Sequence, residues 1–108
     1  MDKPELRREE RIRVNFRGML RLGEIAAPCL VQNMCSRGFL IKSEKELPVG
    51  KSLQLSCELY PETWVECTVQ VRHVNAWCLG ARVVEMSEEG QMLCRRFLQQ
   101  QRTANPNR

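Results

Sequence analysis

The chain has 108 residues, 17 Lys or Arg against 13 Asp or Glu, and a formal net charge of +4. This length supports one domain with a modest core. No apolar run approaches the roughly 18 residues of a spanning helix, and the charged N-terminus lacks the apolar stretch of a secretory signal, so we expect a soluble, cytoplasmic protein with no membrane insertion. His73 and Asp2 are the only residues of their types, which leaves little material for a Ser-His-Asp relay or a His-rich metal site. We therefore expect neither an enzyme nor a metal cofactor.

The positive charge lies mainly at the two ends of the chain. Residues 1–23 hold seven basic and four acidic residues, residues 24–101 hold eight and nine, and residues 102–108 hold two and none. This asymmetry fits an anionic partner that meets a terminal arm, and it fits a solubilising tail equally well. Charge alone leaves both interpretations open.

The six cysteines show no metal-ligand spacing and no C-x-x-C pair. A disulfide framework is not expected without export. Cys57 alternates in step with Leu53, Leu55 and Leu59, and Cys67 with Val65, Val69 and Val71. We interpret the cysteines as free thiols, several of which act as small core residues.

The first strand is predicted directly after a flexible arm. Residues 1–10 are charged and contain Pro4, without apolar periodicity, so we expect an arm that is mobile until something binds it. From Arg11 to Leu22 the residues alternate strictly. One face carries Ile12, Val14, Phe16, Leu20 and Leu22, and the other carries Arg11, Arg13, Arg17 and Arg21. This pattern predicts a strand with a buried apolar face and a cationic outer face.

Five further strands are predicted between turn residues, at 26–34, 39–43, 52–59, 64–75 and 77–86. Six short strands at this spacing indicate an all-β fold, a six-stranded antiparallel β-barrel, because closure removes exposed sheet edges. His73 shares the parity of Val69 and Val71. We therefore expect its side chain to face the interior at one end of the barrel.

The last segment changes from a period of two to a period of 3.6. Ser87 can cap a helix with Glu88 and Glu89 in its first turn, and one apolar stripe comprises Met86, Leu93, Cys94, Phe97 and Leu98. We expect this helix to cover the barrel and to complete a domain over residues 11–101. Residues 102–108 contain Asn-Pro-Asn and are predicted to form a disordered tail.

Two short stretches carry polar or cationic residues that the strand pattern does not require. The first is R-x-x-x-R, formed by Arg7 and Arg11 where the arm meets the first strand. Guanidinium groups bind phosphate bidentately and stack on purines. The second runs from Asn33 through Cys35 to Gly38, between the second and third strands, and an Asn side chain can read a base edge. Alone, each stretch is also compatible with a solvated segment and an ordinary hairpin turn.

In order and context, the two stretches resemble the PilZ domain, a bacterial receptor module for cyclic di-GMP. The family pattern is R-x-x-x-R on an N-terminal arm and then [D/N]-x-S-x-x-G between strands two and three. The resemblance extends to the run from Cys35 to Ile41 and to Leu79-Gly80-Ala81-Arg82-Val83-Val84, and covers residues 6–100. Two positions depart from the pattern. Leu6 stands where the family often has a further Arg, and Cys35 replaces the Ser.

The resemblance implies ligand binding without any bond-making step. The implied ligand contacts are Arg7, Arg8, Arg11, Asn33, Cys35 and Gly38, with Arg37 and Arg13 as further candidates. The arginines would engage phosphate and stack on guanine, Asn33 would read a guanine edge, and Gly38 would let the chain close over the ring. The arm would order on binding and signal to an unidentified downstream protein, in control of motility, biofilm or exopolysaccharide. We expect a monomer or weak dimer.

Two other functions compete with this interpretation. The departures at Leu6 and Cys35 favour a degenerate PilZ-like adaptor that binds protein and no nucleotide. The outward arginine row suggests a nucleic-acid-binding barrel. However, the chain has only six aromatic residues, and Phe16, Phe39 and Trp64 do not fall among those arginines as stacking platforms would. We therefore expect no nucleic acid polymer as a partner.

Overall fold

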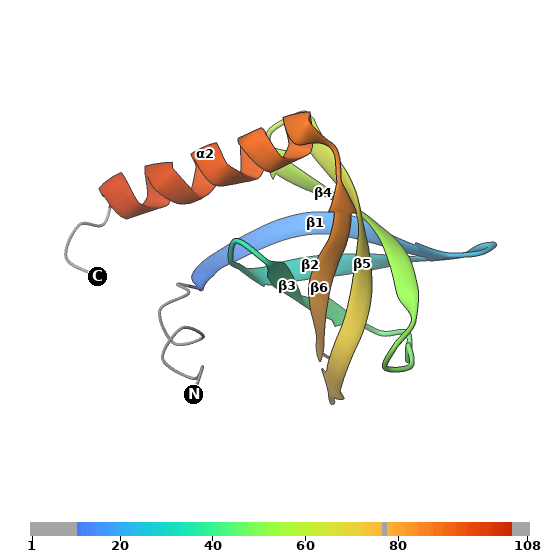
Figure 1. Ribbon diagram of the computed structural model, residues 1–108. Coiled ribbons are helices and arrows are strands. Elements are labelled where there is room, and N and C mark those ends of the chain that lie inside the picture. Colours follow the sequence, from blue (N-terminus) through green and yellow to red (C-terminus); the bar gives the residue numbers. More distant parts are fainter. Residues whose placement is uncertain (1–10, 77, 105–108) are drawn as a thin grey trace, which may run out of the picture.

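Six antiparallel strands close into a barrel, and one helix lies against an end of it (Figure 1). The structure is a computed structural model that describes residues 11–76 and 78–104. The order of strands around the barrel is β1-β2-β3-β6-β5-β4. The strands are β1 (Ile12–Leu22), β2 (Ile25–Met34), β3 (Gly38–Ser43), β4 (Ser52–Tyr60), β5 (Thr63–Asn75) and β6 (Cys78–Met86), and the helix is α2 (Glu88–Ala104). The predicted barrel is confirmed, with strand bounds that differ by at most a residue or so.

The alternation of β1 has the predicted physical consequence. Phe16 and Leu20 are buried inside the barrel, whereas Arg13, Arg17 and Arg21 are exposed outside it. The core continues on the inner faces of the other strands, where Val31, Ile41, Leu53 and Leu55 are almost completely buried. Cys57 and Cys67 belong to this core, as their parity predicts, and all six cysteines are free thiols.

The prediction for His73 is wrong, because β5 contains an irregularity immediately before it. Val71 pairs with Ala81 and His73 with Gly80, so the register between β5 and β6 shifts between these two pairs. A bulge of this kind reverses the parity of the residues that follow it. Val71 is fully buried, whereas His73 is exposed on the outside of the barrel.

The helix packs through the predicted stripe. Ser87 caps it, since the hydroxyl oxygen accepts a hydrogen bond from the Gly90 N–H at 3.1 Å. Phe97 is buried, and its ring packs edge-on against Phe16 and Tyr60, with centroids 5.2 and 5.8 Å away. These contacts fix α2 to the barrel end formed by β1, β4 and β5.

The predicted tail begins too early at residue 102, because α2 continues to Ala104. The sequence from Gln91 to Ala104 contains no Gly or Pro that would end the helix earlier. The remaining predicted tail, 105–108, and the predicted arm, 1–10, lie outside the described residues.

Candidate functional site

An open cavity of about 290 Å³ lies where the β2–β3 connection meets β5 and β6. Its polar lining comes from segments far apart in the sequence. The side chains and backbone around it belong to Arg11, Asn33, Met34, Cys35, Arg37, Gly38, Phe39, Leu40, Arg72, His73, Gly80, Ala81 and Arg82. Barrel closure therefore brings together Arg11, the stretch from Asn33 to Gly38 and the strands of the β5–β6 hairpin.

Backbone hydrogen bonds hold the β2–β3 connection in place. The Cys35 N–H donates to the Gly38 carbonyl at 3.0 Å, which closes the turn. The Val83 N–H of β6 donates to the Arg37 carbonyl at 2.8 Å. The connection is thus attached to β6 as well as to its own strands, and Cys35 and Arg37 stand at a fixed edge of the cavity.

Gly38 is required by the close approach of β3 and β6. It is buried, and a Cβ placed on it would lie 2.2 Å from the backbone carbonyl oxygen of Ala81. A backbone atom in a paired strand cannot move aside cheaply. The glycine therefore has a packing role, in addition to any role at a ligand.

Gly80 provides the surface on which the His73 ring lies. A Cβ at Gly80 would stand 2.1 Å from Cε1 and 2.3 Å from Nε2 of His73. Only a residue without a side chain leaves this space to the imidazole. The exposed part of the His73 ring thereby becomes one wall of the cavity.

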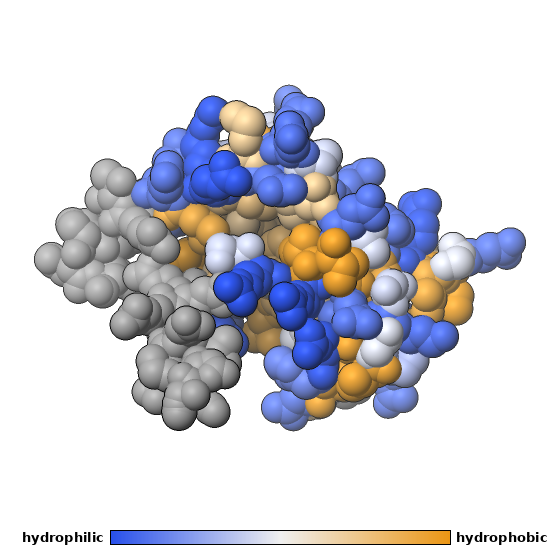
Figure 2. All heavy atoms as spheres, in the orientation of Figure 1, coloured by the Kyte–Doolittle hydropathy of each residue, from blue (hydrophilic) through white to orange (hydrophobic). Residues whose placement is uncertain are grey.

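The cavity is cationic. Four arginines line it, Arg11, Arg37, Arg72 and Arg82, and its lining contains no Asp or Glu. Strongly hydrophilic side chains lie over β3 and β6 in the middle of the face in Figure 2, beside an apolar patch. Guanidinium forks, one amide side chain and the rings of Phe39 and His73 form a set that suits an anion with a planar group.

The cavity gathers most, but not all, of the predicted site residues. Arg11, Asn33, Cys35, Arg37 and Gly38 line it together. Arg13 pairs with Asn33 across β1 and β2, yet its exposed side chain is not part of the lining. Arg7 and Arg8 lie outside the described residues.

Sequence reasoning missed the three polar lining residues Arg72, His73 and Arg82 as site residues. No motif marks Arg72 or His73, whereas Arg82 falls in the run from Leu79 to Val84 that resembles the family. Arg72 and Arg82 come from neighbouring strands joined by the β5–β6 hairpin. The sequence offers one clue to these residues, the predicted pairing of the two strands. This pairing brings Arg72 and His73 to the same end of the barrel as Arg82.

Other kinds of site have little support among the described residues. Within residues 11–76 and 78–104, no group of three or more His, Cys, Asp or Glu side chains is arranged to hold a metal ion. No helix in the same ranges has the length and hydropathy needed to cross a membrane.

The structure thus combines a closed six-stranded barrel with a cavity lined by four arginines. The family model of the PilZ domain matches residues 5–100. The chain therefore belongs to the PilZ domain family. No curated protein sequence matches it.

Solved structures share this fold at low sequence identity. The PilZ domain of YcgR from Escherichia coli, solved with c-di-GMP, is 14% identical with a TM-score of 0.73, over 92% of this chain and 94% of that chain. The inhibitor of motility MotI/DgrA from Bacillus subtilis is 18% identical with a TM-score of 0.74, over 88% of this chain. PlzA from Borreliella burgdorferi, solved in complex with c-di-GMP, is 18% identical with a TM-score of 0.63, over 82% of this chain. The chain spans 50% of the length of MotI/DgrA and 39% of that of PlzA.

Proposed function

We propose that this chain is a cytoplasmic receptor domain for cyclic di-GMP and has no catalytic activity of its own. One observation carries the proposal. Arg11, which ends the first motif, lines the same cavity as Asn33, Cys35 and Gly38 of the second motif, although Asn33 follows Arg11 by 22 positions in the sequence. Family membership supports the ligand, because two of the structural neighbours are solved with c-di-GMP.

The lining residues suggest how the ligand is held. Arg11 and the arm residues Arg7 and Arg8 engage the phosphates, and a guanidinium plane stacks on a guanine. Asn33 pairs with a guanine edge, and Arg37 adds positive charge at the rim. His73, with its ring fixed on Gly80, offers a flat surface for a base. Each contact is non-covalent, so the output is a change of shape.

The arm converts binding into a signal. Residues 1–10 order over the bound dianion and present a new surface to a downstream protein. A role in motility control is consistent with the structural similarity to an inhibitor of motility, with biofilm or exopolysaccharide control as related outputs.

Isothermal titration with cyclic di-GMP tests the receptor function. Wild-type protein is expected to release or absorb heat with a dissociation constant in the micromolar range or below, which corresponds to about 8 kcal/mol or more. Arg11→Ala removes charge-assisted hydrogen bonds and is expected to weaken binding about 10- to 100-fold. Arg13→Ala is the matched control, because Arg13 is an exposed arginine two positions further along the chain, on β1, and does not line the cavity. Absence of heat at about 100 µM ligand would overturn the proposal.

A second candidate function is a PilZ-type adaptor that binds protein and no nucleotide. The substitution of the family's Ser by Cys35 inside the cavity favours it, since a thiol is a weaker hydrogen-bonding group than a hydroxyl. This candidate predicts no heat with cyclic di-GMP for the wild type and for Cys35→Ser alike. A titration of both proteins separates the two functions.

A further inference from the structure

The outer face of the β4–β5 hairpin carries an exposed tryptophan among carboxylates. Trp64 is 48% exposed, on the outward side of β5, and pairs with Glu58 across the hairpin. Among the described residues the ring makes no aromatic or cation–π contact. We call the surface formed by Glu62, Trp64, Glu66 and Glu85 the Trp64 face.

Strand register makes these residues neighbours. Glu66 lies two positions after Trp64 on the same side of β5, and Glu85 of β6 pairs with Thr68, the next outward position. Glu66 and Glu85 are exposed, as is Glu62 at the hairpin turn. The Trp64 face is therefore one continuous surface of the sheet rather than a set of scattered residues.

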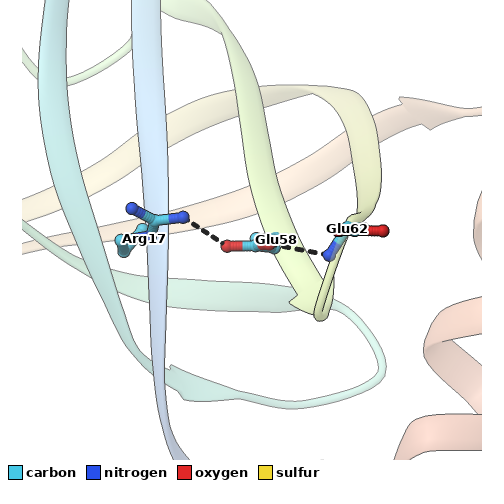
Figure 3. Close-up of polar contacts among 3 residues, drawn as sticks. All are labelled: Arg17, Glu58 and Glu62. Carbon is cyan, nitrogen blue, oxygen red and sulfur yellow. Dashed lines mark hydrogen bonds and ion pairs between the residues drawn. The ribbon is translucent and has the colours of Figure 1, made fainter.

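The hairpin tip is held in shape by Glu58. Its carboxylate accepts a hydrogen bond from Arg17 at 2.8 Å through one oxygen and from the Glu62 N–H at 2.8 Å through the other (Figure 3). Both hydrogen bonds lower the pKa of Glu58 below its ordinary value, and the bond from the Glu62 N–H has the larger effect. Glu58 therefore supports the hairpin from within, whereas the carboxylates of Glu62, Glu66 and Glu85 form no ion pair among the described residues.

The charge around this surface is mainly negative, although Glu85 also lines a second cavity with Arg37, Arg82 and Arg95. No Lys or Arg occurs between Lys51 and Arg72 or between Arg82 and Arg95, and these two intervals hold six glutamates. They form β4, β5, the end of β6 and the first turn of α2. Among the described residues, Arg17 forms an ion pair with a glutamate of this region, and its partner is Glu58. An occupant of the Trp64 face is therefore expected to be cationic.

We infer that the Trp64 face docks an arginine-rich segment of another protein, with Trp64 as the anchor. A guanidinium over the indole gains a cation–π contact, and Glu62 and Glu66 hold neighbouring arginines. Tryptophan is enriched among the residues that dominate binding energy at interfaces. A two-fold contact with a second copy would oppose the same carboxylates and is disfavoured by like-charge repulsion.

Trp64 and the neighbouring Glu62 and Glu66 are separate from the cationic cavity, because none of them lines it. Trp64 and Arg72 lie eight positions apart on β5, which corresponds to about 26 Å along a strand. The hairpins at the two ends of β5 lie at opposite ends of the molecule (Figure 1). The inference therefore does not depend on nucleotide binding.

Fluorescence anisotropy with a short labelled peptide of alternating Arg and Ser tests the docking surface on the full chain. We expect Trp64→Ala to weaken binding about 3- to 5-fold, which matches an exposed cation–π contact. We expect Glu62→Gln with Glu66→Gln to weaken it further and to reduce its salt dependence. Glu44→Gln with Glu46→Gln is the matched control, because it removes the same charge from exposed positions between β3 and β4. Equal losses in both double variants would overturn the inference.

Two further measurements complete the test. The wild type is expected to bind a peptide of alternating Lys and Ser more weakly than the arginine peptide, because arginine stacks better on indole. The Trp64→Ala variant is expected to bind the two peptides with equal affinity. Sedimentation velocity of the chain alone is expected to give a monomer. A dimer that Trp64→Ala dissociates would place a second copy on this face and overturn the assignment to a different protein.

Discussion

At the scale of single residues, we expect Cys35 to influence the affinity of the cavity for its proposed ligand. It lines the cavity at the position where the family pattern has Ser. Cys35→Ser replaces a weak hydrogen-bonding group by a stronger one. One neutral hydrogen bond contributes about 0.5–1.5 kcal/mol, so the variant is expected to bind cyclic di-GMP up to roughly tenfold more tightly. Calorimetric titration of both proteins measures the difference, and a weaker-binding variant would mean that the thiol itself is preferred at this position.

Four thiols, three on barrel strands and Cys94 on α2, are expected to be inert. Burial raises the pKa of Cys57 and Cys67 to about 12 and that of Cys29 and Cys94 to about 11. Because the thiolate is the nucleophile, these four groups should react with a disulfide reagent at pH 8 only after unfolding. Cys35 and Cys78, which are half-buried, serve as internal references in the same titration. Fast reaction of more than two thiols in the folded protein would contradict the predicted burial.

The same pKa shifts predict alkaline destabilisation. A folded-state pKa above the ordinary value of 9.0 means that the native state retains protons that the unfolded state loses. This contribution to stability is complete below pH 9 and falls as the pH rises towards 12. Urea unfolding at pH 8 and pH 10 is therefore expected to give a lower midpoint at pH 10. The Cys57→Ala variant should show a smaller pH dependence of the midpoint than the wild type.

At the scale of elements, two glycines on adjacent strands are predicted to respond differently to the same substitution. In Gly38→Ala the new methyl group meets the Ala81 carbonyl at 2.2 Å, a backbone atom fixed in the β3–β6 pair. In Gly80→Ala it meets the His73 ring, a side chain that can rotate away. We expect about 1–3 kcal/mol of destabilisation for Gly38→Ala and about 0.5–1.5 kcal/mol for Gly80→Ala.

Thermal unfolding of a double-mutant cycle checks the Gly80 contact. If the cost arises from displacing the imidazole, Gly80→Ala should cost almost nothing in a His73→Ala background. An unchanged cost would mean that the backbone of β6, and not the ring of His73, requires the glycine. Gly38→Ala should keep its full cost in that background, which makes it the control.

The same elements explain how far sequence reasoning reaches. The alternation of β1 and the cap at Ser87 were predictable because they are local, repeated patterns. The cavity residues Arg11, Asn33, Cys35, Arg37 and Gly38 were predictable because the two motifs flank the strand pair that brings them together. His73, Arg72 and Arg82 were not, because a bulge in β5 and the closure of the barrel place them, and neither leaves a periodic trace in the sequence.

At the scale of the whole molecule, charge is separated between the two ends of β5. The end of β5 at the β5–β6 hairpin, where the cavity lies, has Arg11, Arg37, Arg72 and Arg82 around it. The end at the β4–β5 hairpin has the glutamates of the Trp64 face. A small dianion is therefore attracted to the first end and repelled from the second before it makes any contact. This field should govern the rate of association more than the rate of dissociation.

Stopped-flow binding of a fluorescent cyclic di-GMP analogue at low and high salt tests this separation of charge. Screening shortens the Debye length from about 10 Å at 0.1 M to about 3 Å at 1 M, so the association rate constant is expected to fall several-fold while the dissociation rate constant changes little. Arg72→Gln with Arg82→Gln should flatten this salt dependence. Arg95→Gln with Arg96→Gln, an equal charge change on exposed positions of α2, should alter it less, because neither residue lines the cavity. If both double variants flatten the dependence equally, net charge alone steers the ligand and the arrangement of arginines around the cavity does not.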